Sequence, residues 1–401
     1  MLTDKMRVLM ASVAAVVITV GIARFAYTPM IPEMMAGAGL SHTLAGLLAT
    51  ANYGGYLSGA LLISFIHSPV LRVRLYQGGL LGAVLTTGLM AYTDQAWLWL
   101  LLRFVSGLCS AAGVLIGAGL LMSWLLKQGH KPELGIFFSG FGIGIALTAL
   151  LAEMIRVRFS WQQQWLIYAA AACLLLLLVV LWSPDYRRTL SSARREPAEA
   201  GNGPGSAFVW LLQLAYFCAG VGYVVTATFL VAIAEASPLW AGQGWMIWLL
   251  TGCAAAPACW LWDRLVRRQG DWPALLLAYL LNALSILLLL DTHGLLGIVL
   301  SAVVYGVSFI GIVSMTLTMV GRLYPDNPSR PMGRLTFGYG TAQMLAPMVV
   351  GYLAQAEGNY ASGLLITLGV ISVGALLLLG AWYLQRQRLE PSCSGGQVLP
   401  D

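Results

Sequence analysis

Charged residues are scarce in this chain. Only 9% of its 401 residues are Asp, Glu, Lys or Arg, whereas 59% are hydrophobic and the mean hydropathy is +0.79. A soluble domain carries about 25% charged residues, so the composition excludes an ordinary soluble protein and indicates an integral membrane protein. The net charge of +6 does not indicate a nucleic-acid partner, because basic residues in membrane proteins first report the orientation of the loops.

Signatures of catalysis and of metal binding are also missing. The chain has no His-Glu-x-x-His, no Gly-x-Ser-x-Gly and no P-loop, and its four histidines are scattered near the ends of apolar runs. The six cysteines include no Cys-x-x-Cys pair, and five of them lie inside apolar runs. We therefore expect no enzymatic activity, no cofactor and no metal site.

Long apolar runs follow one another along the chain. A run of roughly 20 residues is enough to cross a bilayer as a helix. About twelve such spans are expected, at 8–32, 43–66, 75–92, 96–125, 135–156, 163–182, 207–234, 239–262, 273–290, 294–320, 335–355 and 362–385. The predicted fold is all-α, with two pseudo-symmetric six-helix bundles.

Two charged or small-residue stretches interrupt this pattern. The first, at 183–206, contains four arginines and a glycine-rich run, which predicts a flexible cytoplasmic linker between bundles at 1–182 and 207–386. The second, at 387–401, predicts a disordered tail. The bundles look related, because Gly21-Ile22-Ala23-Arg24 and Gly220-Val221-Gly222-Tyr223 occupy corresponding places in the first and seventh spans. Six-span repeats are a transporter feature, with the binding site at the repeat interface.

The distribution of lysine and arginine predicts the orientation. With the N-terminus in the cytoplasm, the expected cytoplasmic segments hold 18 of the 22 basic residues and the external segments hold only Arg156 and Arg158. Cytoplasmic loops carry this excess of basic residues. We therefore expect both termini in the cytoplasm, with the protein in a bacterial inner membrane.

Arg24 lies within the first apolar run. An arginine in mid-membrane costs about 2.5–3.5 kcal/mol on insertion scales, so a partner, a ligand or a wet cavity has to compensate it. Tyr27 and Thr28 follow at helical spacing and extend a polar stripe, which favours a cavity. The alternative is that the long side chain reaches the lipid headgroups.

Other polar or aromatic side chains share helix faces that would line the same cavity. Polar residues buried without partners cost free energy, so Asn52 and Gln343 are the sharper candidates, whereas the aromatic residues have lipid contact or packing as an alternative. The candidate substrate-binding residues are Arg24, Tyr27, Asn52, Tyr53, Tyr223, Thr226, Trp248 and Gln343. The same helix faces carry Tyr56, Tyr216 and Tyr339.

Arg103 is the second arginine inside an apolar run. Structural and coupling roles both remain open for it. The first, fourth, seventh and tenth spans contain no carboxylate, and Glu153 and Glu235 lie only at span ends. Fixed cations without anions in mid-membrane favour an anionic substrate, held on Arg24 with help from Tyr223.

Several motifs resemble one family. Arg103-Phe104-Val105-Ser106-Gly107 is similar to the fourth-span motif of the major facilitator superfamily, and Asp263-Arg264-Leu265-Val266-Arg267-Arg268 resembles its loop motif. The first-span stretch from Gly21 to Pro32 resembles the YbfB/YjiJ-like branch. The resemblance implies a rocking two-bundle carrier, and it implies structural or coupling roles for Arg103, Asp263, Arg264, Arg267 and Arg268. The first-half loop at 67–74 lacks the acidic residue of the motif, so a symmetric latch is not expected.

The sequence thus predicts a secondary active transporter of a small organic solute, with an anion as the favoured class. Efflux of drugs or metabolites is an alternative, and so is a membrane sensor that kept a carrier fold without transport. The expected partners are a small-molecule substrate and the lipid bilayer, with protons as a candidate coupling ion. Nucleic acid is not expected, and a monomer is.

Overall fold

The computed structural model describes residues 3–66, 68–130, 134–186, 206–290, 295–323 and 329–389. Within these ranges the ordered elements are all helices. Most of the expected linker and tail, 187–205 and 390–401, falls outside the described residues. We call residues 3–186 the first half and residues 206–389 the second half.

In the first half, the first and fourth expected spans are each formed by a helix with a π-helical segment inside it. Continuous helices form the other expected spans of this half. Its elements are α1 (Asp4–Val16), η1 (Val17–Phe25), α2 (Tyr27–Ala38), α3 (His42–Ser64), α4 (Pro69–Leu89), η2 (Met90–Tyr92), α5 (Ala96–Ala111), η3 (Ala112–Ile116), α6 (Gly117–Lys127), α7 (Leu134–Arg156) and α8 (Trp161–Trp182). Here η1 and η3 are π-helical and η2 is a 3₁₀ turn.

The second half follows the same plan. Its elements are α10 (Ser206–Ala236), α11 (Gly244–Ala255), α12 (Ala258–Gln269), α13 (Asp271–Leu290), α14 (Leu295–Leu323), α15 (Ser329–Glu357) and α16 (Ala361–Leu389). The expected span 239–262 is broken, because α11 and α12 meet at Pro257 with a bend of 42°. Proline lacks the N–H that would continue the helix through this point.

Local sequence explains where several helices begin and end. Ser41 caps α3 by accepting from the Leu44 backbone N–H at 3.1 Å, and Ser160 with Gln163 forms a capping box at the start of α8. Helix α2 ends at Gly39, whose φ of 66° lies in the left-handed region that glycine adopts without strain. The resulting short loops make consecutive helices run antiparallel.

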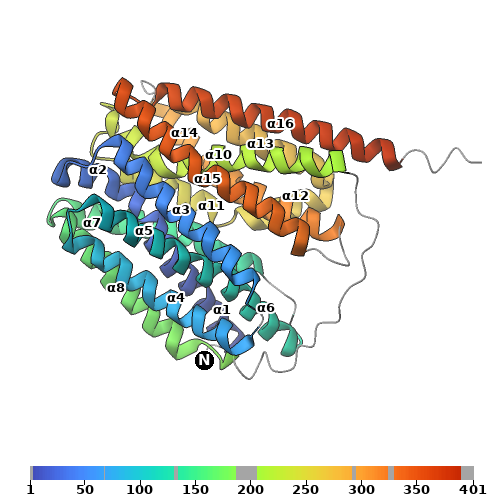
Figure 1. The fold of residues 1–401 in the computed structure, drawn as a ribbon, viewed down its shortest axis with the longest axis horizontal. Helices are drawn as coiled ribbons and strands as arrows, with labels where there is room; N and C mark the ends of the chain where they lie inside the picture. The colour runs from blue at the N-terminus through green and yellow to red at the C-terminus, as the bar shows by residue number, and fades with distance from the viewer. Residues whose placement is uncertain are drawn as a thin grey trace, which may run out of the picture.

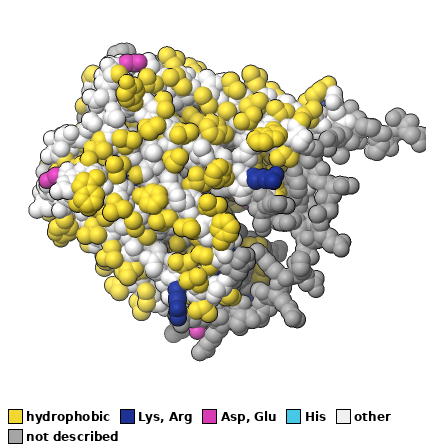
Figure 2. All heavy atoms as spheres, in the orientation of Figure 1, with side chains coloured by type: hydrophobic (Ala, Val, Ile, Leu, Met, Phe, Trp, Pro, Cys, Tyr) yellow, Lys and Arg dark blue, Asp and Glu magenta, His cyan; other side chains and the backbone are white. Residues whose placement is uncertain are grey.

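In the part of the chain that the structure describes, eight helical segments are long and apolar enough to cross a membrane, and the bent pair α11–α12 would make nine. The surface agrees with this, since hydrophobic side chains cover most of the visible face in Figure 2 and its few charged ones lie near the edges. Helices α3, α4 and α15 are equally long but more polar, and they are not among the eight. The all-helical fold is confirmed, whereas the exact count of twelve spans is not, because eight or nine apolar spans are found among the described residues.

The two halves lie side by side in Figure 1, with α3 against α15 and the helices diverging toward the α8–α10 connection. We call that end the linker end and the opposite one, where α2 meets α3, the far end. The hydrogen bonds that join the halves come from the far-end part of the helices: Arg24–Gln343, Thr28–Ala227, His42–Gln355, His42–Tyr360 and Thr50–Met344. Contacts between the halves thus close the far end.

Candidate functional site between the halves

Arg24 lies in the π-helical segment η1, between the regular helices α1 and α2. The wider turn is completed by the Ala26 N–H, which donates to the Gly21 carbonyl five residues back at 2.9 Å. Single-turn π-helices occur often at functional sites, because they redirect a side chain and free backbone carbonyls. In η1 the free carbonyls accept hydrogen bonds from side chains of α5, and Arg24 contacts the second half.

Helix α5 supplies the donors for those carbonyls. Arg103 Nη1 and Ser106 Oγ both donate to the Ala23 carbonyl at 2.9 Å, and Ser110 Oγ donates to the Thr19 carbonyl. The three side chains lie on one face of α5, and the two carbonyls lie one turn apart on η1. Arg103 is 3% exposed, and its guanidinium also packs on the Tyr27 ring at 4.4 Å. These contacts give Arg103 a structural place, in which it holds the π-helix.

Arg24 points into the contact between the halves. Its side chain is 6% exposed, which does not match a side chain reaching the headgroups. Its Nη2 donates to Gln343 Oε1 of α15 at 3.2 Å. The guanidinium carbon lies 4.1 Å from the centre of the Tyr53 ring and 4.7 Å from that of Tyr56, so cation–π attraction stabilises the charge.

These neighbours leave the charge of Arg24 without an anion. In the part of the chain that the structure describes, no carboxylate forms an ion pair with it. Its Nε–H has no hydrogen-bond partner. A buried cation compensated by neutral groups alone is costly, and a bound oxyanion would supply the missing counter-charge.

Aromatic rings of the second half continue the surface on which Arg24 lies. The Tyr223 ring meets the Tyr53 ring edge to face at 6.3 Å and stacks on Tyr339 at 5.9 Å. Tyr216 stacks on the other side of Tyr339 at 4.4 Å, and Phe309 stacks on Tyr223 at 5.3 Å. The stack therefore connects α10, α14 and α15 to the guanidinium of the first half.

Three further predicted residues leave polar atoms unsatisfied. Asn52 Oδ1, Thr226 Oγ1 and Trp248 Nε1 are buried without a partner, and the Trp248 ring packs edge to face on Phe25, the neighbour of Arg24, at 5.9 Å. Buried polar atoms are nearly always hydrogen-bonded. The orphaned N–H and O–H groups along this contact add to the case for a ligand.

Tyr27 and Asn52 pack inside the first half and do not join the group around Arg24. The Tyr27 hydroxyl donates to the Ala45 carbonyl at 2.9 Å, and Asn52 Nδ2 donates to the Arg103 carbonyl at 3.1 Å. Asn52 lies where α3 and α5 approach through glycines, since a Cβ on Gly55 would meet the Phe104 carbonyl and one on Gly107 would meet the Asn52 carbonyl. Both side chains therefore serve helix packing in this structure.

Sequence reasoning missed Ser106, Ser110, Tyr305 and Phe309. Arg103, Ser106 and Ser110 are three and four residues apart, and this spacing predicts one polar face on an apolar helix. Tyr305 and Phe309 are four residues apart, and their rings stack at 5.0 Å while the Tyr305 hydroxyl donates to the Tyr223 carbonyl at 2.9 Å. Nothing in the sequence separates this pair from other aromatic pairs.

Comparison with known proteins identifies the family to which the chain belongs. A family model described as "Uncharacterised MFS-type transporter YbfB" matches residues 16–379. The chain belongs to this family. No curated protein matches the chain. Among solved structures, the nucleoside transporter NupG aligns with a TM-score of 0.75 at 13% identity, covering 95% of this chain and 99% of that one. The human organic anion transporter MFSD10 (TETRAN) aligns with a TM-score of 0.64 at 16% identity, covering 94% and 100%.

Membership in the YbfB family and the likeness to these folds make the chain a multi-pass membrane transporter of the MFS type. The fold carries no information on the substrate at such low identity. The second-half loop motif of the superfamily lies on the last turns of α12, where Asp263, Arg264, Arg267 and Arg268 are all exposed. Arg264 packs on the Trp260 ring at 5.6 Å.

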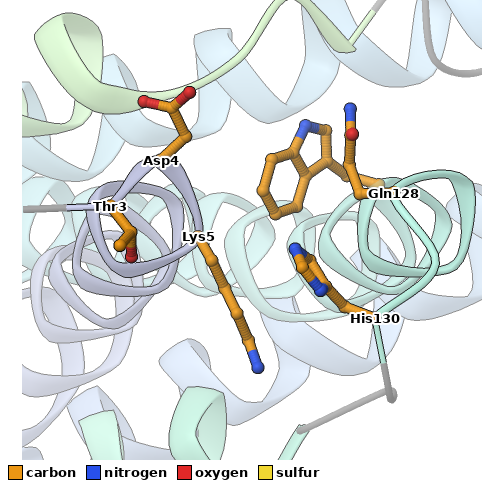
Figure 3. A pocket seen from close by; sticks show the side chains of 6 residues that line it. Thr3, Asp4, Lys5, Gln128 and His130 are labelled. Carbon is orange, nitrogen blue, oxygen red and sulfur yellow. The ribbon is translucent and has the colours of Figure 1, made fainter.

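A separate pocket of about 470 Å³ lies at the linker end of the first half. Figure 3 shows Thr3, Asp4 and Lys5 at the start of α1 on one side and Gln128 and His130 after α6 on the other. Trp124 of α6 also lines the pocket. All of its lining comes from the first half. The pocket is therefore apart from the contact on which Arg24 lies.

Proposed function

We propose that this member of the YbfB family is a secondary active transporter of a small organic anion, and that Arg24 binds the anionic group. The observation that carries the proposal is the buried guanidinium between the halves, with one neutral hydrogen-bond acceptor and two ring faces as its partners. A substrate oxyanion would pair with Arg24 Nε and Nη. Arg24 would then be compensated only when the substrate is bound.

The neighbouring residues would set the orientation of the substrate. Gln343 of the second half accepts a hydrogen bond from Arg24 Nη2 and so fixes the orientation of the guanidinium. The planar group can then pair with an oxyanion through two hydrogen bonds. The stack of Tyr216, Tyr223 and Tyr339 offers ring faces and edges for the carbon part of the solute.

Transport would proceed by alternating access of two six-helix bundles, 1–182 and 207–386. The far end is closed by contacts between the halves, so the substrate would exchange from the linker end in this conformation. The excess of basic residues in the expected cytoplasmic segments supports a cytoplasmic linker end and cytoplasmic termini, and the membrane would be a bacterial inner membrane. Each bundle would supply six of twelve spans, and a monomer would contain the complete pathway.

Counterflow in reconstituted vesicles tests the proposal. Purified protein is first screened by thermal shift against a panel of organic acids, because a ligand at 100 times its Kd adds about 2.7 kcal/mol to stability. Vesicles are then loaded with the best acid and its labelled form is added outside. We expect transient accumulation that is absent with Arg24→Gln. Binding without counterflow in the wild type would indicate a sensor and overturn the transport proposal.

A further inference from the structure

The segment at 24–28 of the first half lies along two helices of the second half. The Phe25 ring packs edge to face on Trp248 of α11 at 5.9 Å. One turn further on, Thr28 Oγ1 donates to the Ala227 carbonyl of α10 at 2.6 Å. The contact beside this segment is thus formed by α11 around Trp248 and by α10 around Ala227.

Trp248 carries an unpaired donor at this contact. It is 0% exposed, and in the described part of the chain its indole Nε1–H has no hydrogen-bond partner. Gly252 follows four residues later on the same face of α11, and a Cβ on it would meet the backbone nitrogen of Ala146 in α7. The face that carries Trp248 is therefore turned toward the first half. An indole N–H can only donate, so it needs an acceptor.

Thr226 carries a second unpaired group. It is 0% exposed, and its hydroxyl also lacks a partner among the described residues. A threonine inside a helix can donate to the carbonyl four residues back, as Thr251 does to the Ile247 carbonyl at 3.0 Å, but Thr226 does not. It lies three residues after Tyr223 on the same face of α10, and the Tyr223 ring meets Tyr53 of the first half. Its hydroxyl therefore lies on the side of α10 that contacts the first half.

Helix geometry gives the approximate spacing of these groups from Arg24. Thr28 lies four residues after Arg24, which is about 6 Å along a helix, and Trp248 packs on the residue directly after Arg24. The unpaired N–H and O–H thus lie roughly one helical turn from the guanidinium, toward the far end. Burying such groups without partners costs free energy, and an oxygen atom of a ligand would offset that cost.

We propose that the transported anion carries a second oxygen, as a carbonyl or hydroxyl group about one helical turn from its carboxylate, and that Trp248 and Thr226 bind it. Trp248 donates to this oxygen. The Thr226 hydroxyl donates to a carbonyl or accepts from a hydroxyl. A hydrocarbon acid would leave both groups unpaired, and a site built to hydrogen-bond a substrate rejects the analogue that lacks the polar group. The inference rests on the proposed function, because Arg24 has to hold the carboxylate.

Binding of matched pairs of acids to the full-length protein tests the proposal. The probes are 4-oxopentanoate, 5-oxohexanoate and 6-oxoheptanoate, and each is compared with the acid of the same chain length that lacks the oxo group. Affinities are measured by calorimetry for the wild type and for variants at the two residues. Trp248→Phe removes the N–H and keeps a ring, whereas Thr226→Val removes the hydroxyl and keeps the branched shape.

Two further variants serve as controls. Thr226→Ser keeps the hydroxyl. Trp240→Phe removes an indole N–H that is also buried without a partner in the described ranges, but that lies in the loop between α10 and α11. Both variants should bind the acids as the wild type does.

We expect at least one oxo acid to bind the wild type about fivefold more tightly than its partner acid, since one neutral hydrogen bond supplies roughly that factor. Trp248→Phe and Thr226→Val should each reduce this preference, and the double variant should abolish it. The proposal is overturned if no oxo acid is preferred, or if the double variant keeps the preference. Acids that still lose affinity in Arg24→Gln would then leave the proposed function standing. Acids that bind Arg24→Gln as tightly as the wild type would contradict the proposed function itself.

Discussion

The two buried arginines differ in what their guanidinium groups contact. Arg103 donates to a backbone carbonyl that the π-helix leaves available, inside the first half. Arg24 meets a neutral amide and two tyrosine rings at the contact between the halves. Among the described residues neither guanidinium has a carboxylate partner, and each has a buried Nε without a hydrogen-bond partner. The two arginines therefore differ in position, because Arg103 lies inside the first half and Arg24 lies between the halves.

The different positions of Arg103 and Arg24 predict different effects of their replacement on the free energy of unfolding. Arg103→Met removes a charged hydrogen bond to the Ala23 carbonyl, and such bonds contribute about 1.5–3 kcal/mol. The free energy of unfolding should fall by that order. Arg24→Gln loses one longer hydrogen bond, to Gln343 at 3.2 Å, and also removes a buried charge whose partners are neutral, so the free energy of unfolding should fall by less than in Arg103→Met. Thermal unfolding in one detergent compares the two, and equal stability of Arg103→Met and the wild type would refute the structural role.

At the scale of single helices, close approach of α3 and α5 holds the first half together. A methyl group on Gly107 would overlap the Asn52 carbonyl, whereas one on Gly119 of α6 meets nothing within 4 Å. Gly107→Ala should therefore destabilise the fold by at least about 1–3 kcal/mol through overpacking. Gly119→Ala should be neutral or slightly stabilising. Yield and melting temperature of the two variants measure this, and a stable Gly107→Ala protein would contradict the packing.

The contacts of His42, at the start of α3, with Gln355 of α15 and with Tyr360 just before α16 predict that closure of the far end depends on pH. His42 donates its backbone N–H to Gln355 at 3.1 Å, and its Nδ1 lies 2.8 Å from the Tyr360 hydroxyl. Burial lowers the pKa of the His42 imidazole. The neutral ring therefore stabilises closure above the ordinary value of about 6.5, and this stabilisation is lost as the pH falls below it.

Lowering the pH from 7 to 5 should thus increase the open population at the far end. Spin labels at the exposed positions Val157 of the first half and Ala356 of the second half, in an otherwise cysteine-free chain, report the distance between the halves. His42→Gln removes the titrating ring and should abolish the change. A pH response that persists without His42 would assign it to another group.

Sequence patterns predicted the helices well and the details of the site less well. The apolar runs mark the helices because each has to cover its own backbone hydrogen bonds in lipid. The burial of Arg24 followed from the cost of its charge. The π-helix η1 did not follow, because its carbonyls are satisfied by Arg103, Ser106 and Ser110, about 80 residues further along the chain. The contact of Asn52 with the carbonyl of Arg103 could not be read from the sequence for a similar reason, and its role in substrate binding stays a prediction.

At the scale of the whole molecule, hydrogen bonds join the halves at the far end, while the helices diverge toward the linker end. Arg24 lies on the contact that would open and close in the proposed alternating access. A charge placed there without a counter-ion would link the binding of an anion to the arrangement of the halves.

Equilibrium binding of an anion and of its uncharged analogue tests the role of Arg24 most directly. The best organic acid from the screen and its amide are titrated against the wild type and Arg24→Gln. The wild type should prefer the acid by at least tenfold, which is about 1.4 kcal/mol, and Arg24→Gln should bind both equally. If Arg24→Gln kept the full preference for the acid, the guanidinium would not be the anion site and the account would be wrong.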